Sequence, residues 1–547
     1  MHHPVTFTRL GDFTATRRLL ILSAIAVALG LAGAVIAVAL LDLIALSTNL
    51  FFHHRLSIEP ASPVSHELGR WAILVPVLGG LIVGLIARFG SERIRGHGIP
   101  EAIEAILING SRVEPKLAVL KPLSAAIAIG SGGPFGAEGP IVMTGGAVGS
   151  LVAQCFHLSS AERKTLLVAG SAAGMAAVFA TPLAAVLLAV ELLLFEWKPR
   201  SFVPAALAAA TAAAARRWLL GLGPIFPVTP HPVAIPMTAL ALCCVAGGAA
   251  AMLSIAMTRA VYASEDAFLR LPIHWMWWPA IGGLAIGIGG WFFPQALGVG
   301  YDTIGALLQQ DVPVATLAGI LFVKFSIWAV ALGSGTSGGV LAPLLMVGGA
   351  LGGLEAQVFP AMGPGFWPLV SMAAILGGTM RTPFTAVVFA LELTHDFNMV
   401  LPLLVAVTIA YALTVLGVRR SILTEKIARR GYHLTREYAT DPLEIVFVRE
   451  VMQPLDAPGI GTPPAGPGTF AYPDEPLRAV AYRMAATGAT WLPVVDPDSG
   501  GAAVGAITLG NLLQGRMQVL EAEQRRERVL TFRMPLPAWV WERSGEL

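Results

Sequence analysis

Glu138 is the residue whose type and position most directly suggest chemistry. It is the one Asp, Glu, Lys or Arg between Pro122 and Ala161, within the segment GSGGPFGAEGP. A carboxylate in an apolar stretch long enough to cross a membrane is costly, so its presence indicates a function. The sequence therefore makes Glu138 a candidate functional carboxylate.

The residues around Glu138 predict that it lies at the start of a helix. Glycines precede it, and Gly139 and Pro140 follow directly. Glycine before a helix and proline in its first turn are typical of a helix N-terminus. The unpaired N–H groups there favour negative charge, so a dissolved anion and the carboxylate would compete for the same donors. A capping glutamate that never moves would show the same pattern, and both interpretations remain open.

Two further segments have the same form. GHGIP at residues 96–100 precedes the helical pattern EAIEAILING, and GSGTSGGVLAP at 333–343 opens another apolar helix. Broken helices at membrane depth are tolerated only where they face protein or a water-filled cavity. Three helix N-termini directed at one point would bind an anion without a nearby lysine or arginine and would repel a cation. The sequence therefore predicts an anion site.

The composition predicts that these segments lie in a membrane. Only 13% of the 547 residues are charged, against about 25% in soluble chains. Residues 19–41, 235–258 and 400–418 carry no charge, and each run has the length of a membrane-crossing helix. Strand-length stretches of alternating polarity are absent from the sequence, so helices are the expected spanning elements. We predict an all-α polytopic membrane protein.

Charge flanking the apolar runs predicts the orientation. The basic residues are Arg9, Arg17 and Arg18 before the first run, and Arg419, Arg420, Lys426, Arg429 and Arg430 after the last. The positive-inside rule then places both termini in the cytoplasm of a multi-pass cell-membrane protein. The first run is too long for a signal-peptide core, so we expect it to be retained. The net charge of +2 gives no indication of nucleic acid as a partner.

The apolar body contains an internal repeat. Residues 136–154 match residues 339–357 at an offset of 203, and residues 181–192 match residues 382–393 at an offset of 201. Such repeats are typical of transporter folds, whose binding site lies near the middle of the bilayer between the two halves. The sequence alone does not show whether the repeats are inverted.

These motifs resemble those of the CLC family of chloride channels and proton-coupled chloride exchangers, over about residues 19–430. GHGIPE resembles the family's GSGIPE, GAEGP resembles GREGP, and GGVLAP resembles GGIFAP. The resemblance implies inverted repeats, a homodimer with one pore per subunit, chloride or another small anion as substrate, and Glu138 as the external gating glutamate. It implies that His97 stands at the anion-coordinating serine. The backbone amides expected to face the anion are those of Ala137, Glu138, Gly139, Val340 and Leu341.

Three positions depart from the family pattern. His97 replaces the serine, so a ring N–H is expected to donate to the anion, with a histidine that only packs as the alternative. Thr424 stands where the family often has an anion-binding tyrosine. Leu192 stands where exchangers carry an internal proton-transferring glutamate, and an alkyl side chain cannot carry a proton. Glu191 is expected to face another surface, because adjacent helical residues point about 100° apart. We therefore predict a channel gated by Glu138, with a proton-coupled exchanger that uses Glu196 or water as the alternative.

The soluble part after the body resembles one CBS motif, in residues 473–515, with Val448 to Met452 leading into it. A helix, a strand, a DPDSGG turn, a second strand and a further helix are expected there. A single copy predicts pairing across a dimer. No ligands for a nucleotide are found in it, so we expect a structural role and no cofactor. The predicted domains are a cytoplasmic lead 1–18, a transmembrane domain 19–418, a linker helix 419–445, a CBS-like domain 446–530 and a tail 531–547.

Alternatives from other classes were also considered. Gly335 to Gly339 matches the serine-nucleophile pattern GxSxG with Ser337 at its centre. A serine nucleophile needs a nearby base, and the sequence offers no obvious one. An intramembrane hydrolase is therefore the remote alternative, and we predict no enzyme. The cysteines Cys155, Cys243 and Cys244 have no spacing that suggests a disulfide framework or a metal site. A membrane sensor in which the body only anchors the tail would need neither the buried charge nor the repeat.

Overall fold

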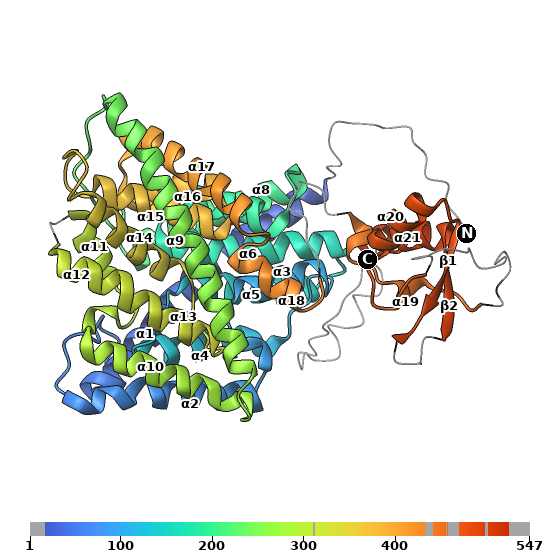
Figure 1. Ribbon diagram of the computed structural model, residues 1–547, viewed down its shortest axis with the longest axis horizontal. Coiled ribbons are helices and arrows are strands. Elements are labelled where there is room, and N and C mark those ends of the chain that lie inside the picture. Colours follow the sequence, from blue (N-terminus) through green and yellow to red (C-terminus); the bar gives the residue numbers. More distant parts are fainter. Residues whose placement is uncertain are drawn as a thin grey trace, which may run out of the picture.

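The computed structural model describes residues 17–309, 312–432, 441–455, 457, 470–497 and 502–524. A large helical body is followed by a small α/β unit at one end (Figure 1). Most of the predicted lead 1–18, the predicted tail 531–547, part of the DPDSGG turn and most of the loop at 454–468 lie outside the described residues.

The body is built from helices of very unequal length. The helices of its first half are α1 Arg18–His53, α2 Leu74–Phe89, α3 Ile99–Leu107, α4 Pro115–Gly130, α5 Glu138–Gln154, α6 Ser160–Phe179, α7 Pro182–Leu188 and α8 Pro199–Leu219. Those of the second half are α9 Met237–Leu269, α10 Trp278–Phe292, α11 Tyr301–Gln309, α12 Val314–Gly319, α13 Phe325–Gly333, α14 Leu341–Glu355, α15 Phe366–Met380, α16 Pro383–Thr394, α17 Val400–Gly417 and α18 Ile422–Arg429. Two π-helical turns, Ala189–Leu194 and Ile320–Lys324, extend α7 and join α12 to α13.

Several helical segments in the described part of the chain are long and apolar enough to cross a membrane. They are Arg18–His53, Gly69–Phe89, Met237–Leu269, Val314–Gly333 and Phe397–Arg429. The uncharged runs 19–41, 235–258 and 400–418 form most of α1, α9 and α17, respectively, and α1 and α9 extend well beyond them. The helical prediction for these runs is confirmed.

The repeat seen in the sequence is a repeat of helices. Helices α5 and α14 begin at matching positions, and so do α7 and α16. Glu191, at the end of the first repeat, accepts hydrogen bonds from the N–H groups of Phe384 and Thr385 at the start of α16. Glu392 accepts in the same way from Leu183 and Ala184 at the start of α7. Each repeat therefore caps the other, as expected of two halves related by a two-fold axis.

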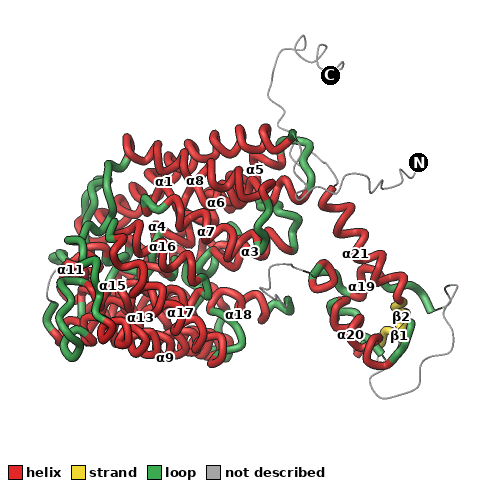
Figure 2. Tube along the Cα trace, turned by 90° about the horizontal axis from the view of Figure 1, so that it is seen from above, coloured by secondary structure: helices red, strands yellow, loops and turns green. Residues whose placement is uncertain are grey.

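The two repeats are inverted. The strand-like residues Gly136 and Gly339 pair antiparallel, immediately before α5 and α14. The two helices start from this pair and extend toward opposite ends of the body, α5 toward the α/β unit (Figures 1 and 2) and α14 away from it (Figure 1). Their N-termini consequently face each other in the interior.

Paired glycines allow the helices of each repeat to pack closely. A Cβ added at Gly145 of α5 would lie 2.3 Å from the carbonyl oxygen of Gly170 on α6, and one added at Gly352 of α14 would lie 2.2 Å from that of Trp367 on α15. Small residues at such contacts are a common way for membrane helices to approach each other. This close packing holds the N-termini of α5 and α14 at fixed positions.

The α/β unit contains α19 Val448–Val451, α20 Leu477–Thr487, α21 Leu509–Gln524 and the strands β1 Trp491–Val495 and β2 Ala503–Thr508. The strands pair antiparallel, with Trp491 opposite Thr508. Leu477, Leu492 and Ile507 belong to its buried core. The order of helix, strand, strand and helix is the predicted one, and the likeness of the unit to a CBS motif stays a prediction.

Candidate anion-binding site

Three glycine-rich loops meet in the middle of the body. Gly136 and Gly339 exchange backbone hydrogen bonds of 3.3 and 2.9 Å, and the N–H of Gly338 donates to the carbonyl of Gly96 at 3.4 Å. A Cβ added at Gly139 would lie 1.7 Å from the carbonyl oxygen of His97. The starts of α3, α5 and α14 are thus brought together, as the sequence predicted.

The start of α3 is held by charged side chains that are themselves buried. Glu101 accepts a 2.9 Å hydrogen bond from the N–H of Gly98 and pairs with Lys426 at 2.8 Å. Lys121 donates to the carbonyls of Ile94 and Gly96, both at 2.7 Å. Each charge therefore has a partner, which limits the cost of burial.

The Glu138 carboxylate lies between the starts of α5 and α14. The side chain is fully buried, and a Cβ added at Gly136 or Gly339 would lie 1.7 or 2.6 Å from its Oε2. The backbone N–H groups of Glu138 and Ala342 face the carboxylate, although among the described residues no donor reaches either oxygen with hydrogen-bond geometry. The carboxylate therefore lies at the starts of α5 and α14, and binding of a dissolved anion there stays a prediction.

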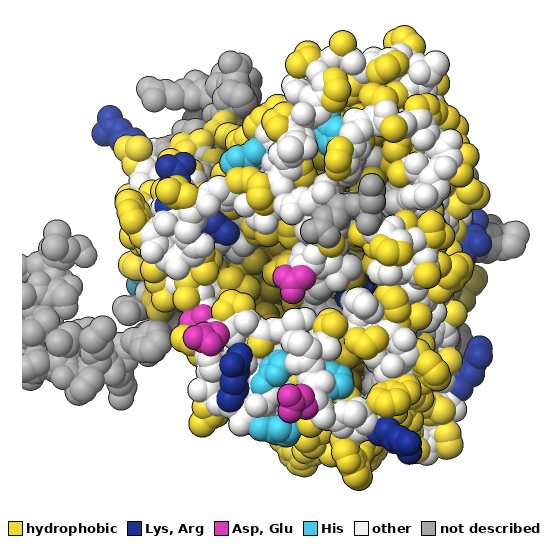
Figure 3. Space-filling model, turned by 90° about the vertical axis from the view of Figure 1, so that its left-hand side faces the viewer, with side chains coloured by type: hydrophobic (Ala, Val, Ile, Leu, Met, Phe, Trp, Pro, Cys, Tyr) yellow, Lys and Arg dark blue, Asp and Glu magenta, His cyan; other side chains and the backbone are white. Residues whose placement is uncertain are grey.

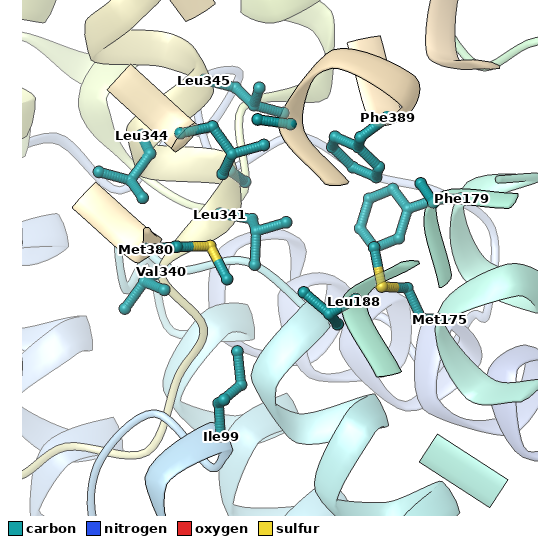
Figure 4. Packing of buried hydrophobic residues seen from close by; sticks show 14 of the residues in the cluster. Ile99, Met175, Phe179, Leu188, Val340, Leu341, Leu344, Leu345, Met380 and Phe389 are labelled. Carbon is teal, nitrogen blue, oxygen red and sulfur yellow. The ribbon is translucent and has the colours of Figure 1, made fainter. Parts of the chain in front are cut away.

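Apolar side chains pack between the helix starts and the helices around them (Figure 4). The labelled side chains of Figure 4 are Ile99, Val340 and Leu341 from the helix starts, and Met175, Phe179, Leu188, Leu344, Leu345, Met380 and Phe389 from the helices around them. The rings of Phe179 and Phe389 pack edge to face at 5.4 Å. At Val340 and Leu341 the side chains are buried among these neighbours, which leaves the backbone as the polar group that these residues can offer an anion.

His97 lies on the side of the site that faces the α/β unit. Its side chain is almost fully buried, and its Nδ1 has no hydrogen-bond partner among the described residues. It borders a cavity of about 980 Å³ that is also lined by Arg95, Lys426, Arg429 and Arg430. A buried ring nitrogen without a partner is available to a ligand, and donation from His97 to an anion stays a prediction.

Substitution of His97 tests that role. His97→Ser is expected to change the ratio of chloride to nitrate flux, because a hydroxyl and a ring N–H differ in reach and in the geometry that they offer an anion. Flux of each anion from proteoliposomes gives the ratio. Thr181→Ser, which trims a buried hydroxyl residue at the start of α7, is the control. An unchanged ratio in His97→Ser would place the ring outside the anion's contacts.

Thr424 forms hydrogen bonds with Ser421 at the start of its own helix, α18. The N–H of Ser421 donates to its Oγ1 at 3.1 Å, and the N–H of Thr424 donates to the Ser421 Oγ at 3.3 Å. This reciprocal pair caps α18 in the manner of a capping box. The capping role explains why a threonine stands here, and its predicted donation to the anion stays a prediction.

The side chain of Leu192 is apolar and fully buried, so it cannot carry a proton. It lies in the π-helical turn Ala189–Leu194. Glu191 turns away from it to cap α16, which confirms that Glu191 serves a structural purpose on another surface.

Glu196 lies in the loop after this turn, outside the membrane-spanning helices. It pairs with Lys198 at 3.0 Å and Arg200 at 3.7 Å and accepts a hydrogen bond from Ser201. Burial alone would raise the pKa of Glu196, but Lys164, Lys198 and Arg200 together lower it below its ordinary value. The carboxylate is therefore ionised at neutral pH.

Ser337 is hydrogen-bonded to another serine, Ser124, which cannot act as the base that a nucleophilic serine needs. The Ser124 hydroxyl donates to the Ser337 Oγ at 3.1 Å, and both side chains are fully buried. A nucleophilic serine requires a base such as an imidazole at this position. The contact gives the hydrolase alternative no support.

Three buried polar residues near the site were missed by sequence reasoning: Lys121, Tyr301 and Lys324. Lys324 was detectable as the last charge before the charge-free stretch from Phe325 to Leu354. No local signal connects it, or Tyr301, to Glu138.

Comparison with known proteins identifies the family. Residues 78–415 match the family described as "Voltage gated chloride channel". The chain is 30% identical over 356 residues to the putative chloride channel protein ClcB-like of Ralstonia nicotianae, covering 62% of this chain and 82% of that protein. It is 28% identical over 362 residues to the H(+)/Cl(-) exchange transporter ClcA of Vibrio vulnificus, covering 63% and 77%.

A solved structure shows the same fold. It is described as a slow cyanobacterial Cl-/H+ antiporter and superposes with a TM-score of 0.66 at 21% identity, covering 76% of this chain and 99% of that one. The matched family spans most of the helical body, including the helix starts around Glu138. The chain therefore belongs to the CLC family.

Proposed function

We propose that this protein moves chloride across the cell membrane and that it exchanges chloride for protons. The observation that carries the proposal is the Glu138 carboxylate, buried where three helix N-termini meet. An anion and an ionised carboxylate suit the same donors, so one must leave for the other to bind. Protonation of Glu138 allows it to leave, which links a proton to each anion that enters.

Exchange has better support than the channel that the missing inner glutamate favoured. The ClcA relative is named an exchange transporter, and the solved structure with this fold is described as an antiporter. Leu192 cannot transfer protons, but this excludes exchange only if the proton path must pass through that residue. Glu196 and the cavity that reaches His97 supply an ionised carboxylate and space for water on that side.

The assembly and orientation follow from the family likeness and from charge. We expect a homodimer in which each chain contains its own site, with both termini in the cytoplasm. Arg17, Arg18, Arg429 and Arg430 lie at the ends of the body from which the termini continue, which agrees with the positive-inside rule. The cavity beside His97 would then open toward the cytoplasm.

The test is proton movement driven by chloride alone. Purified protein in liposomes is given an outward chloride gradient, the membrane potential is clamped, and the pH outside is recorded. Chloride leaving down its gradient is expected to drive protons into the liposomes against their own gradient. Liposomes without protein measure the leak of both ions.

Two results would contradict the proposal at different levels. Chloride efflux without uphill proton movement would show a channel. The absence of chloride flux from folded, reconstituted protein would overturn chloride transport itself. An inner route through Glu196 is then tested by Glu196→Gln, which should slow proton movement more than chloride movement.

A further inference from the structure

A second buried charge, that of Lys324, interacts with Glu138. Lys324 ends the π-helical turn between α12 and α13, and its side chain is fully buried. Its Nζ donates to the carbonyl of Gly298 at 2.7 Å. A lysine ammonium has three donors, and that of Lys324 interacts electrostatically with the Glu138 carboxylate. Neither carboxylate oxygen of Glu138 has a hydrogen-bond partner among the described residues, so the two charges are not in direct contact.

Tyr301 contributes a second polar group to the same region. It is the first residue of α11, three positions after Gly298. Its hydroxyl is buried and has no hydrogen-bond partner among the described residues, and it too interacts electrostatically with Glu138. A buried hydroxyl without a partner costs free energy unless a ligand or water satisfies it.

The segment that carries these groups is tied to the loop before Glu138. The N–H of Gly298 donates to the carbonyl of Gly132 at 3.0 Å. Gly298, Tyr301 and Ala137 line a cavity of about 550 Å³, and the face of the body away from the α/β unit is hollowed near its centre (Figure 3). This cavity therefore extends past Tyr301 to Ala137, the residue before Glu138.

The local geometry also indicates a function. A π-helical turn interrupts regular helical hydrogen bonding, and such turns occur frequently at functional sites. A lysine buried without a carboxylate in contact is costly, which a purely structural role at Gly298 would not require. An anion between Lys324 and Glu138 would satisfy both the ammonium and the Tyr301 hydroxyl.

We propose that Lys324 and Tyr301 form an anion site, the outer site, next to Glu138 on the side away from the α/β unit. Its ligand is a small monovalent inorganic anion, chloride in the transport cycle. This inference rests on the proposed function and adds a loading step to it. The anion binds the outer site while Glu138 blocks the path, and it moves inward when protonation releases the carboxylate from between α5 and α14.

Bromide bound to the purified full-length protein tests the outer site directly. Crystals of Glu138→Gln soaked in bromide are expected to show anomalous scattering within hydrogen-bond distance of the Lys324 Nζ and the Tyr301 hydroxyl. Lys324→Met in the same background should lose that peak, and calorimetric titration should show bromide affinity at least about tenfold weaker, as expected for loss of a hydrogen bond to a charged group. Tyr301→Phe removes only the hydroxyl and should weaken binding by a smaller factor.

Two matched substitutions serve as controls. Lys116→Met removes a charge from an exposed position at the start of α4, and Tyr411→Phe removes a hydroxyl from α17. Both should bind bromide as the background protein does. Gel filtration and thermal unfolding confirm that each variant is folded.

Separate results overturn separate claims. No bromide at Lys324, or an unchanged peak and affinity in both Lys324→Met and Tyr301→Phe, would overturn the outer site even if chloride flux is intact. If Lys324→Met does not fold, Tyr301→Phe alone decides, because it changes one atom. Bromide bound at the outer site of a protein that moves no chloride would instead overturn the proposed function and leave the site in place.

Discussion

Glu138→Gln is expected to move chloride at a rate that hardly depends on external pH, whereas the native protein should speed up as the outer solution becomes more acidic. In the native protein the ionised carboxylate competes with the anion for the helix N-termini, and protonation removes that competition. Glutamine has the same shape without the charge. Uphill proton movement should be abolished in the variant, because the group that carries the proton is absent. Chloride efflux and pH are recorded from the same liposomes over a range of external pH.

Glu191→Gln is the matched control for this experiment. Glu191 is also a membrane-domain glutamate, but its carboxylate is bonded to the N–H groups of Phe384 and Thr385. Its substitution should cost about 1 kcal/mol of stability, as for loss of a helix cap, and should leave the pH dependence unchanged. An equally steep pH dependence in Glu138→Gln and native protein would show that Glu138 is a fixed capping residue and that the gate lies elsewhere.

Gly136→Ala is expected to open the path without changing Glu138 itself. A Cβ at Gly136 would lie 1.7 Å from the Glu138 Oε2 and 2.4 Å from its Oε1. Because these atoms end a flexible side chain, the carboxylate should move aside while the backbone stays in place. Chloride flux in Gly136→Ala should therefore be high at neutral pH and nearly independent of external pH, as in Glu138→Gln.

Gly139→Ala provides the contrast. Its Cβ would lie 1.7 Å from the backbone carbonyl oxygen of His97, which cannot move without separating α3 from α5. This variant should lower the yield of folded protein and the unfolding temperature, whereas Gly136→Ala should leave both close to native. Native pH dependence in folded Gly136→Ala would mean that the carboxylate does not rest over Gly136.

The signals that worked in the sequence are local ones. A single charge in an apolar stretch, glycines before a helix, and proline in its first turn predicted the starts of α3, α5 and α14. These features act through the backbone geometry of neighbouring residues, so they can be recognised without knowledge of the rest of the fold. The repeat was visible in the sequence because both halves use the same residue types at matching contacts. The glutamates Glu191 and Glu392, for example, each cap a helix of the other half.

One local signal was overlooked. Ser421 and Thr424 stand three residues apart at the start of α18, the spacing of a capping box. The family likeness drew attention to Thr424 as an anion ligand, while its simplest role is to cap the helix with Ser421. Here the sequence contained the answer, because the interaction spans less than one helical turn.

The amino-acid sequence by itself determined that the chain spans a membrane, that it repeats, and that Glu138 starts a helix in its interior. Only the tertiary structure decided what surrounds that carboxylate. Lys324 and Tyr301 follow Glu138 by more than 160 positions, and they reach it because the loop at Gly298 bonds to Gly132. Contacts of this kind depend on how whole helices pack against one another, and spacing along the chain does not record that packing.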